Sequence, residues 1–310
     1  MTAFLNALSS VSVVLILTMV GYFFARFGWM QEHDKTFITK LLMNVAIPCN
    51  CIYGLTTRLT HDLLANAGFL ILVPILGILA CYGLSYLVAK HFRMSRKRFG
   101  VFMAMCSVSN AMFIGLPMCT LLFGSESLPY IMFYYIGNSL LLHCFAMPLI
   151  RWSGASSSSV TDTVKGILTT PPIYGTLIGF IVILGDLAIP QILLSSMKYM
   201  SDLVSPLALL MTGYVIQKTG IRHIRLERDL WLVMAFRFLI QPALCIFLCA
   251  VFMLDSMARS VFAVESAMPV ISLAVVAATN FGADEEFAAS GAALSTLLCF
   301  IVIPVLMVIV

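Results

Sequence analysis

The chain has 310 residues, of which 61% are hydrophobic and 10% charged, and its mean hydropathy is +1.02. This composition excludes a soluble globular domain, in which about 25% of residues are charged, and predicts an integral membrane protein. The charged residues behind the net charge of +4 cluster in short loops between apolar runs. This placement indicates that they orient the chain in a lipid bilayer, and it argues against a nucleic-acid partner.

Apolar runs of the length that spans a bilayer, about 20 residues as a helix, recur along the chain. Because these runs do not alternate with polar residues, they predict helices and not the strands of a β-barrel. The predicted fold class is an all-α polytopic membrane protein of about ten transmembrane helices, near 4–25, 36–55, 66–89, 99–121, 128–150, 168–186, 191–216, 230–253, 258–281 and 287–309.

Basic residues are distributed unequally between the predicted loops, and cytoplasmic loops carry the excess of Lys and Arg. The loops after the first, third, fifth and seventh helices hold 14 basic residues, whereas the other loops hold only Arg58 and Arg259. Arg26 follows the first apolar run and no basic residue precedes that run, the reverse of a secretory signal. The sequence therefore predicts a multi-pass protein of the cell membrane with both termini outside the cytoplasm.

A serine-rich stretch at residues 153–165 divides the predicted helices five and five. This composition is typical of a flexible linker, here on the cytoplasmic side. We therefore predict a first five-helix repeat at 1–152 and a second at 166–310. An odd number of spans in each half places the halves in opposite orientations, as in transporters built from inverted repeats.

Prolines interrupt corresponding helices of the two halves. Pro48 and Pro206 are predicted breaks in the second helix of each half, while Pro117 and Pro269 interrupt the fourth. A proline frees a backbone carbonyl, which at membrane depth is tolerated beside other protein or a water-filled cavity. Half-helix N-termini that face such a cavity carry partial positive charge, which predicts a small organic anion as substrate. For any single proline, packing between helices is the simpler explanation.

Few polar groups lie inside the predicted helices. Asn110 and Asn138 lie at mid-membrane depth, where each either binds substrate or bridges two helices. Glu265 precedes Pro269 by one turn and is a candidate for binding a coupled proton or sodium ion, with exposure at the membrane interface as the alternative. Arg237 is expected to snorkel to the cytoplasmic face.

The sequence contains no motif of an enzyme, a cofactor site or a metal site. It lacks a nucleophile elbow, a P-loop and paired aspartates in an apolar setting. The nine cysteines lie within apolar runs and are expected to pack as small residues and not to bind metal. We therefore expect secondary or facilitated transport by a protein that is not an enzyme.

Four segments carry a family resemblance: Gly21–Gly28, Asn44–Pro48, Asn110–Pro117 and a stretch from Ala267 into the last helix. Together they resemble the auxin efflux carrier family, whose bacterial members are mostly described as malate, malonate or other organic-acid permeases. The resemblance covers essentially the whole chain and implies a fold like that of sodium/proton antiporters and bile-acid transporters. In it, helices one, two, six and seven form a scaffold, helices 3–5 and 8–10 form a mobile transport domain, and the broken helices four and nine cross beside the substrate.

The resemblance and the helix breaks together indicate the substrate site. The candidate residues come from the crossing motif of the fourth helix, the polar residues of the fifth and the break in the ninth. They are Asn110, Gly115, Pro117, Asn138, Pro269 and Ser272. One departure concerns the ninth helix, where Ala274 stands in place of a second proline of the plant carriers.

The expected function is secondary transport of a mono- or dicarboxylate, with malate or malonate favoured by the resemblance, through elevator-type alternating access. Coupling to a proton or sodium gradient and a homodimer through the scaffold are further expectations. One alternative is a sodium-coupled carrier of larger sterol-like anions, which needs several acidic or hydroxyl ligands around the crossing. Another is a membrane sensor or interaction protein, which would lack a water-accessible central cavity.

Overall fold

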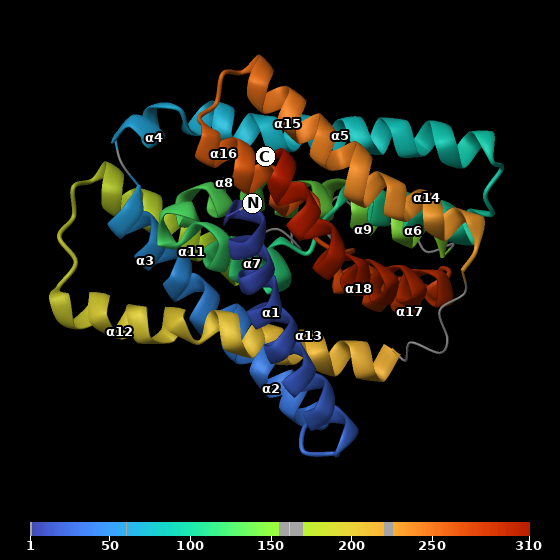
Figure 1. Ribbon diagram of the computed structural model, residues 1–310, viewed down its shortest axis with the longest axis horizontal. Coiled ribbons are helices and arrows are strands. Elements are labelled where there is room, and N and C mark those ends of the chain that lie inside the picture. Colours follow the sequence, from blue (N-terminus) through green and yellow to red (C-terminus); the bar gives the residue numbers. More distant parts are fainter. Residues whose placement is uncertain (1, 60, 155–160, 162–169, 220–225) are drawn as a thin grey trace.

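The computed structural model describes residues 2–59, 61–154, 161, 170–219 and 226–310, and these form helices and one isolated bridge (Figure 1). Three of the described apolar helices are short, at Ala111–Phe123, Pro171–Leu184 and Ser272–Phe281. Seven are long and apolar enough to cross a membrane: Leu8–Arg26, Glu32–Arg58, Ala67–His91, Ser125–Ser153, Gln191–Lys218, Arg228–Val251 and Glu285–Ile309. The predicted all-α polytopic class is confirmed, while ten spans and an inverted repeat stay predictions.

The elements of the first half are α1 (Thr2–Arg26), α2 (Glu32–Leu41), η1 (Leu42–Ala46), α3 (Ile47–Arg58), α4 (His61–Ala65), α5 (Ala67–His91), α6 (Arg96–Ser107), η2 (Ala111–Gly115), α7 (Leu116–Phe123), η3 (Ser125–Ser127), α8 (Leu128–Leu141), η4 (Leu142–Ala146) and α9 (Met147–Ser153). The second half contains α11 (Pro171–Leu184), α12 (Gln191–Asp202), α13 (Val204–Thr219), α14 (Arg228–Ala235), η6 (Phe236–Ile240), α15 (Gln241–Val251), α16 (Ser256–Ser266), α17 (Ser272–Phe281) and α18 (Glu285–Ile309). The predicted linker lies outside the described residues except for Ser153, Gly154 and Thr161.

Four described helices contain a turn of π-helix, and each turn ends two residues before a proline. The turns are η1, η2, η4 and η6, and the prolines are Pro48, Pro117, Pro148 and Pro242. A proline ring clashes with the carbonyl four residues before it, and the wider π turn relieves this clash. The N–H of Ile47, for example, donates to the carbonyl of Leu42, five residues back.

Because of these π turns, a proline does not necessarily end its helix. Pro48 lies in a helix that continues from Glu32 to Arg58. Pro206 is the third residue of α13, just after the turn at Leu203 that separates α12 from α13.

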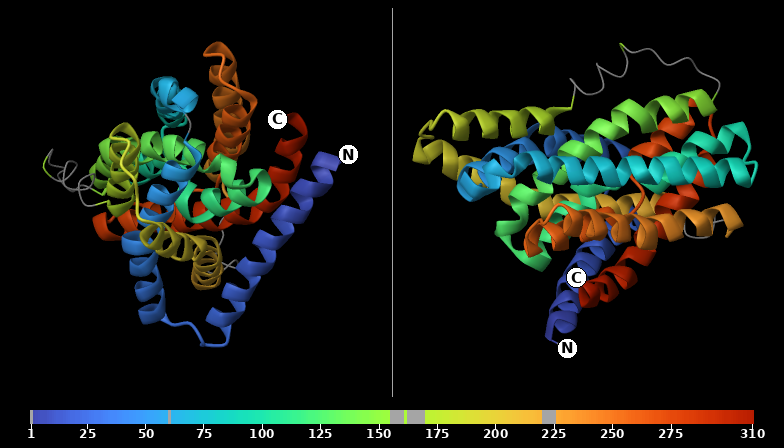
Figure 2. Two further views of the ribbon diagram at one scale, coloured as in Figure 1. Left: turned by 90° about the vertical axis from the view of Figure 1, so that its left-hand side faces the viewer. Right: turned by 90° about the horizontal axis from the view of Figure 1, so that it is seen from above.

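Segments α1, α2–α3, α11 and α12–α13 pack against one another (Figures 1 and 2), and two glycines let α1 and α13 approach closely. A Cβ atom at Gly21 of α1 would lie 2.1 Å from the carbonyl oxygen of Leu210, and one at Gly213 of α13 would lie 1.9 Å from that of Thr18. Small residues that let two backbones approach are a common basis of helix association in membranes. The glycines therefore hold α1 and α13 at backbone contact.

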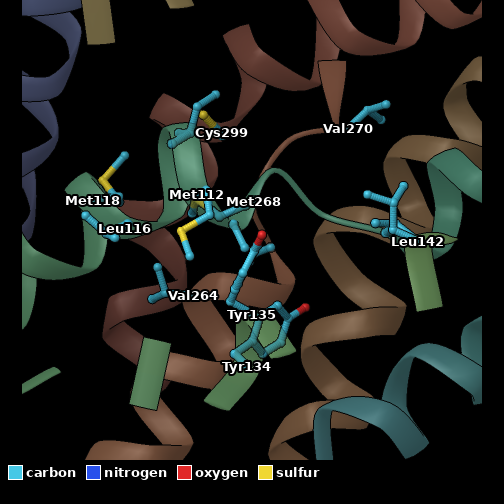
Figure 3. Packing of buried hydrophobic residues seen from close by; sticks show 14 of the residues in the cluster. Met112, Leu116, Met118, Tyr134, Tyr135, Leu142, Val264, Met268, Val270 and Cys299 are labelled. Atoms are coloured by element: carbon cyan, nitrogen blue, oxygen red, sulfur yellow. The ribbon is translucent and has the colours of Figure 1, made fainter. Parts of the chain in front are cut away.

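The remaining long helices pack mainly on each other, through the pairs α5–α8, α5–α6, α6–α9, α15–α16 and α17–α9. Their apolar core surrounds two interrupted helices, α6–α7 and α16–α17 (Figure 3). Met112 and Leu116 from the first of these belong to the same buried cluster as Tyr134 of α8 and Met268 of the second. The core of the molecule thus lies around the two helix breaks.

Candidate functional site

The two helix breaks lie side by side and are joined through their main chains. The first break, at residues 108–110, separates α6 from η2 and α7, and the second, at 267–271, separates α16 from α17. The N–H of Asn110 donates to the carbonyl of Pro269 at 2.9 Å, and Ser109 forms an antiparallel bridge with Val270. We call this contact between the two breaks the crossing.

Side chains from neighbouring helices satisfy the main chain that the breaks expose. The amide of Asn138 in α8 accepts a hydrogen bond from the N–H of Ser109 at 3.0 Å and donates one to its carbonyl at 2.9 Å. In the second break, the hydroxyl of Ser295 in α18 accepts from the N–H of Val270 at 3.0 Å. An unsatisfied backbone group at membrane depth would cost several kcal/mol, roughly, so these residues stabilise the breaks.

Arg237 lies fully buried against the second break. Its Nε and Nη2 donate to the carbonyl of Met268 at 3.1 and 2.8 Å, and Nη2 also donates to that of Ser266 at 2.7 Å. Its Nη1 donates to Oε1 of Gln241 at 2.5 Å, and Nε2 of Gln241 donates to the carbonyl of Ser107, the last residue of α6, at 2.8 Å. Arg237 and Gln241 thereby join the ends of α6 and α16.

The prediction that Arg237 snorkels to the cytoplasmic face is wrong, because its side chain has 0% exposure. The carbonyls that α16 leaves free at its C-terminal end accept the guanidinium donors inside the protein. The sequence signal for this role is the spacing of Arg237 and Gln241, which places two polar side chains on one face of an apolar helix.

A cavity of about 330 Å³ lies beside the crossing. Its size falls within the usual range of small-molecule sites, about 300–1,000 Å³. Lys35 is the one lining residue with a permanent charge among those the structure describes, and no carboxylate is among them. The polar lining residues are Lys35, Thr39, Ser109, Asn110, Tyr135, Asn138, Ser139, His143, Thr170, Thr212, Ser272 and Thr296.

Three of the six predicted substrate residues line this cavity, namely Asn110, Asn138 and Ser272. The other three, together with both predicted breaks of the second helices, are not among the described lining residues: Gly115, Pro117, Pro269, Pro48 and Pro206. The side-chain amide of Asn138 is engaged by Ser109, so it bridges two helices as well as facing the cavity. The side-chain amide of Asn110 makes no hydrogen bond with any described residue.

Glu265 is fully buried in the last turn of α16, so the alternative of exposure at the interface is wrong. Neither of its carboxyl oxygens has a hydrogen-bond partner among the described residues. The carboxyl rests against Gly115, where a Cβ atom would lie 2.3 Å from Oε2. Cys119, four residues further along in α7, faces the same carboxyl.

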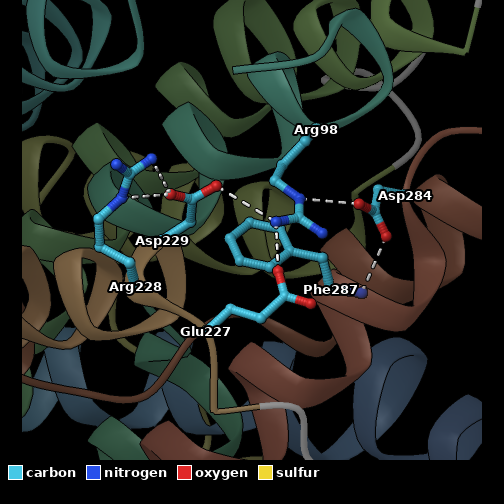
Figure 4. A network of polar contacts seen from close by, with 6 residues as sticks. All are labelled: Arg98, Glu227, Arg228, Asp229, Asp284 and Phe287. Atoms are coloured by element: carbon cyan, nitrogen blue, oxygen red, sulfur yellow. Dashed lines mark hydrogen bonds and ion pairs between the residues drawn. The ribbon is translucent and has the colours of Figure 1, made fainter. Parts of the chain in front are cut away.

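A second polar cluster surrounds Arg98, at the start of α6 (Figure 4). Its Nε donates to Asp284 at 2.9 Å, and its Nη1 donates to Glu227 at 2.5 Å and to Asp229 at 3.2 Å. The guanidinium also lies over the ring of Phe287, 4.5 Å from its centroid. This cluster ties together the ends of α6, α14 and α18, away from the cavity.

Imidazole, thiol and carboxylate side chains are not clustered as metal ligands in the described residues. Among them, no group of three or more His, Cys, Asp or Glu side chains is arranged to hold one. The nine cysteines are free thiols, and most are buried among apolar neighbours, as expected for small packing residues.

Comparisons with known proteins place nearly the whole chain in one class. Residues 7–307 match the sequence profile of the membrane transport protein family. A relative from Methanothermobacter thermautotrophicus, described as an uncharacterized transporter, is 28% identical over 305 residues that cover 97% of each chain. A second uncharacterized transporter, from Methanocaldococcus jannaschii, is 24% identical over 305 residues, which cover 94% of this chain and 95% of the relative.

Proposed function

This chain belongs to the membrane transport protein family, the auxin efflux carrier family that its motifs resemble, and we propose that it is a secondary transporter of a small organic anion. Membership of the family implies a lipid bilayer and a small-molecule substrate. The proposal concerns the charge of that substrate, the site that binds it and the motion that moves it.

The proposal of an anionic substrate rests on two helix N-termini that line the same cavity. The first turn after the first break, Ala111–Phe113, and the first residues of α17, Ser272 and Leu273, both line it. The first N–H groups of a helix have no partner within the helix and carry partial positive charge, which favours an anion. The single lining charge, Lys35, has the same sign, and its ammonium is paired at 2.6 Å with Glu32, a carboxylate outside the described lining.

Within this site, Asn110 donates to a substrate carboxylate, and Ser272 offers a hydroxyl from the opposite half-helix. Asn138 acts through Ser109, because its amide is already bonded to that main chain. Gly115, Pro117 and Pro269 are not among the described lining residues; Pro269 accepts the hydrogen bond that joins the two breaks, and Gly115 contacts the carboxyl of Glu265. A carboxylate accepts several hydrogen bonds, and each bond to a charged group contributes roughly 1.5–3 kcal/mol.

The proposed motion is elevator-type alternating access between two groups of helices. The scaffold consists of α1, α2–α3, α11 and α12–α13, and the remaining helices move as the transport domain. The close contacts at Gly21 and Gly213 support a rigid scaffold, while the hydrogen bonds of Arg237 and Gln241 support a rigid transport domain. The cavity is lined by both groups, with Thr39 and Met211 from the scaffold and Asn110 from the transport domain.

The proposed arrangement in the cell membrane has two inverted five-helix halves, 1–152 and 166–310, with both termini outside the cytoplasm. Malate or malonate remains the favoured substrate through the family resemblance. A cavity of about 330 Å³ whose described lining has no carboxylate disfavours a sodium-coupled carrier of sterol-like anions. The presence of the cavity likewise disfavours a sensor without transport.

The test is uptake of radiolabelled malate, malonate and related acids into proteoliposomes, with and without imposed proton and sodium gradients. Saturable uptake of one acid, absent from protein-free liposomes, supports the proposal and identifies the substrate. Absence of uptake under every gradient, with the protein shown to be folded by size-exclusion chromatography, contradicts a small carboxylate as substrate.

A further inference from the structure

Two side chains of opposite charge, Arg237 and Glu265, are buried near the crossing, and neither is among the described residues that line the cavity. Arg237 and Glu265 both have 0% exposure, and among the described charged residues no other is so fully buried. Arg237 donates to the carbonyl of Ser266, the residue that follows Glu265 in the chain. The two nevertheless form no ion pair with each other or with another described residue.

The charge of Arg237 is permanent. A guanidinium is not deprotonated in proteins, and here its donors are taken by main-chain carbonyls and by the neutral amide of Gln241. These acceptors satisfy its hydrogen bonds but leave its unit charge uncancelled. Every state of the transporter therefore contains one positive charge beside the crossing.

The charge of Glu265 is variable. An ionised carboxylate that is buried without hydrogen bonds is strongly disfavoured, whereas a neutral acid tolerates the same place. A hard cation would need several oxygen ligands, but this carboxyl rests on the backbone of Gly115 and faces the thiol of Cys119. A proton is therefore the ligand that fits Glu265.

The surroundings of Glu265 supply no second charge of their own. The membrane-embedded titratable side chains on the elements around α16, namely η6, α7, α8, α15 and α18, are one guanidinium, four thiols and three phenols: Arg237, Cys119, Cys245, Cys249, Cys299, Tyr130, Tyr134 and Tyr135. Asp255 and Arg259 lie at the opposite end of α16, about 9–15 Å away at 1.5 Å per residue. Of all these groups, Arg237 alone is charged within the core of the crossing.

Resting on the proposed anion transport, we propose that Glu265 is the proton site of a proton–anion symporter and that Arg237 is the fixed charge that couples the two ligands. With the cavity empty and Glu265 ionised, the charges of Arg237 and Glu265 cancel. With Glu265 protonated and one negative charge in the cavity, Arg237 and the substrate cancel. The proton comes from water on the side of uptake and returns to water on the side of release.

The two states in which only one of the two ligands, proton or anion, is bound would carry a net charge into the low-dielectric membrane. An empty carrier with Glu265 protonated carries one positive charge, and a loaded carrier with Glu265 ionised carries one negative charge. Moving a charge into the bilayer is strongly disfavoured, so the transport domain crosses with both ligands or with neither. The same balance selects the singly charged form of an acid over its dianion.

The main chain also links the two sites mechanically. Asn110 borders the cavity, and Gly115, which covers the Glu265 carboxyl, follows it by five residues at the end of the η2 turn. When a bound anion attracts the start of this turn, Gly115 moves with it and no longer contacts the carboxyl of Glu265.

The first test needs no substrate and measures the carboxyl directly. Infrared spectra of the purified protein in lipid are recorded across pH, following the carbonyl stretch of protonated carboxylic acids. We expect a band at neutral pH that is absent from Glu265→Gln and retained in Glu285→Gln, a matched change at an exposed carboxyl. A band that Glu265→Gln leaves unchanged would overturn the proton site, even in a protein that transports anions.

The second test separates coupling from transport in proteoliposomes, using the acid found by the uptake screen. Wild-type uptake should rise when the lumen is made alkaline and should not respond to sodium. Glu265→Gln is permanently neutral, so it should still exchange external for internal acid but lose gradient-driven net uptake by about tenfold or more, or ~1.4 kcal/mol in a barrier. Glu285→Gln should behave as wild type, and Glu265→Asp, which keeps a carboxyl, should retain coupling.

Gradient-driven net uptake that survives in Glu265→Gln overturns the coupling role. Equal loss of exchange and net uptake in a folded Glu265→Gln protein also overturns it, because the residue then serves transport in general. Wild-type uptake that ignores the pH gradient overturns symport but leaves anion transport standing. If wild type transports none of the acids, the proposed function fails, and the infrared titration still decides the proton site.

Discussion

The backbone N–H of Asn110 donates a 2.9 Å hydrogen bond to the carbonyl of Pro269, so the two interrupted helices meet through main chain at the edge of the cavity. This bond needs only the backbone of Asn110, and its side-chain amide makes no hydrogen bond within the described chain. One residue thus has two places in the structure, with its main chain closing the crossing and its side chain lining the cavity.

Asn110→Ala keeps the bond to Pro269 and removes only the amide. Since a hydrogen bond to a charged acceptor contributes roughly 1.5–3 kcal/mol, the dissociation constant of the transported acid should rise about tenfold or more, with folded yield near that of wild type. Equilibrium binding of the radiolabelled acid measures this. Asn44→Ala, an exposed asparagine that is not among the lining residues, is the control. Unchanged binding in Asn110→Ala would mean that its amide is structural.

Asn138→Ala should act on stability as well as on binding. It leaves the N–H and carbonyl of Ser109 without their partners, at about 1–3 kcal/mol for each buried group. We expect a lower thermal unfolding temperature in detergent, unlike the result for Asn110→Ala. Equal unfolding temperatures for the two variants would refute the bridging role of Asn138.

Gly115→Ala places a methyl group where the carboxyl of Glu265 lies, 2.3 Å from Oε2. Overpacking of this kind costs roughly 1–3 kcal/mol, so the unfolding temperature should fall. Gly83→Ala, in the interior of α5 with open space around its Cα, is the matched control and should be neutral or slightly stabilising. If both variants unfold alike, the carboxyl of Glu265 does not occupy the space beside Gly115.

Arg237→Met removes the donors that satisfy the carbonyls of Ser266 and Met268. With each orphaned group contributing about 1–3 kcal/mol, the loss of stability should reach several kcal/mol, seen as a large drop in unfolding temperature. Arg259→Met, at an exposed position on α16, should change it little. Arg237→Lys keeps the charge but not the planar fork, so it should fall between wild type and Arg237→Met.

Lys35→Gln removes the only permanent charge among the described lining residues. The KM for the transported acid should rise, most strongly at low ionic strength, because long-range attraction between charges is screened by salt. Lys40→Gln, an exposed lysine on the same helix that is not among the lining residues, should leave KM unchanged. Equal effects of the two variants would point to surface charge in general.

Length and hydropathy were sufficient to predict the helical class, because a bilayer allows few other structures for apolar runs of this length. The position of the first break was less predictable. Pro117 indicated it, yet the chain leaves the helix at residues 108–110, and Pro117 lies inside the following helix, Ala111–Phe123, where the η2 turn accommodates it. Similarly, Pro48 suggested a break, but η1 accommodates the proline within one helix.

Part of the site was predictable because asparagines at mid-membrane depth are rare, and Asn110, Asn138 and Ser272 do line the cavity. The buried place of Arg237 was not predictable from its own helix. In a helix surrounded by lipid, the side chain of an arginine is expected to extend to the membrane surface. The carbonyls that accept its hydrogen bonds, those of Ser266 and Met268, lie about thirty residues later in the chain. The interior becomes favourable for the Arg237 side chain only because its helix packs against the end of α16 in the folded protein.

In the proposed cycle, the buried charge of Arg237 also governs the response of transport to the voltage across the membrane. A unit charge moved through a potential of 100 mV gains or loses about 2.3 kcal/mol, so a carrier that moved Arg237 alone would run fast in one direction and slowly in the other. In the proposed cycle, each moving state pairs this guanidinium with one negative charge, either Glu265 or the substrate. Both crossings are then electrically silent, and the rate of uptake should not change when a potential is imposed.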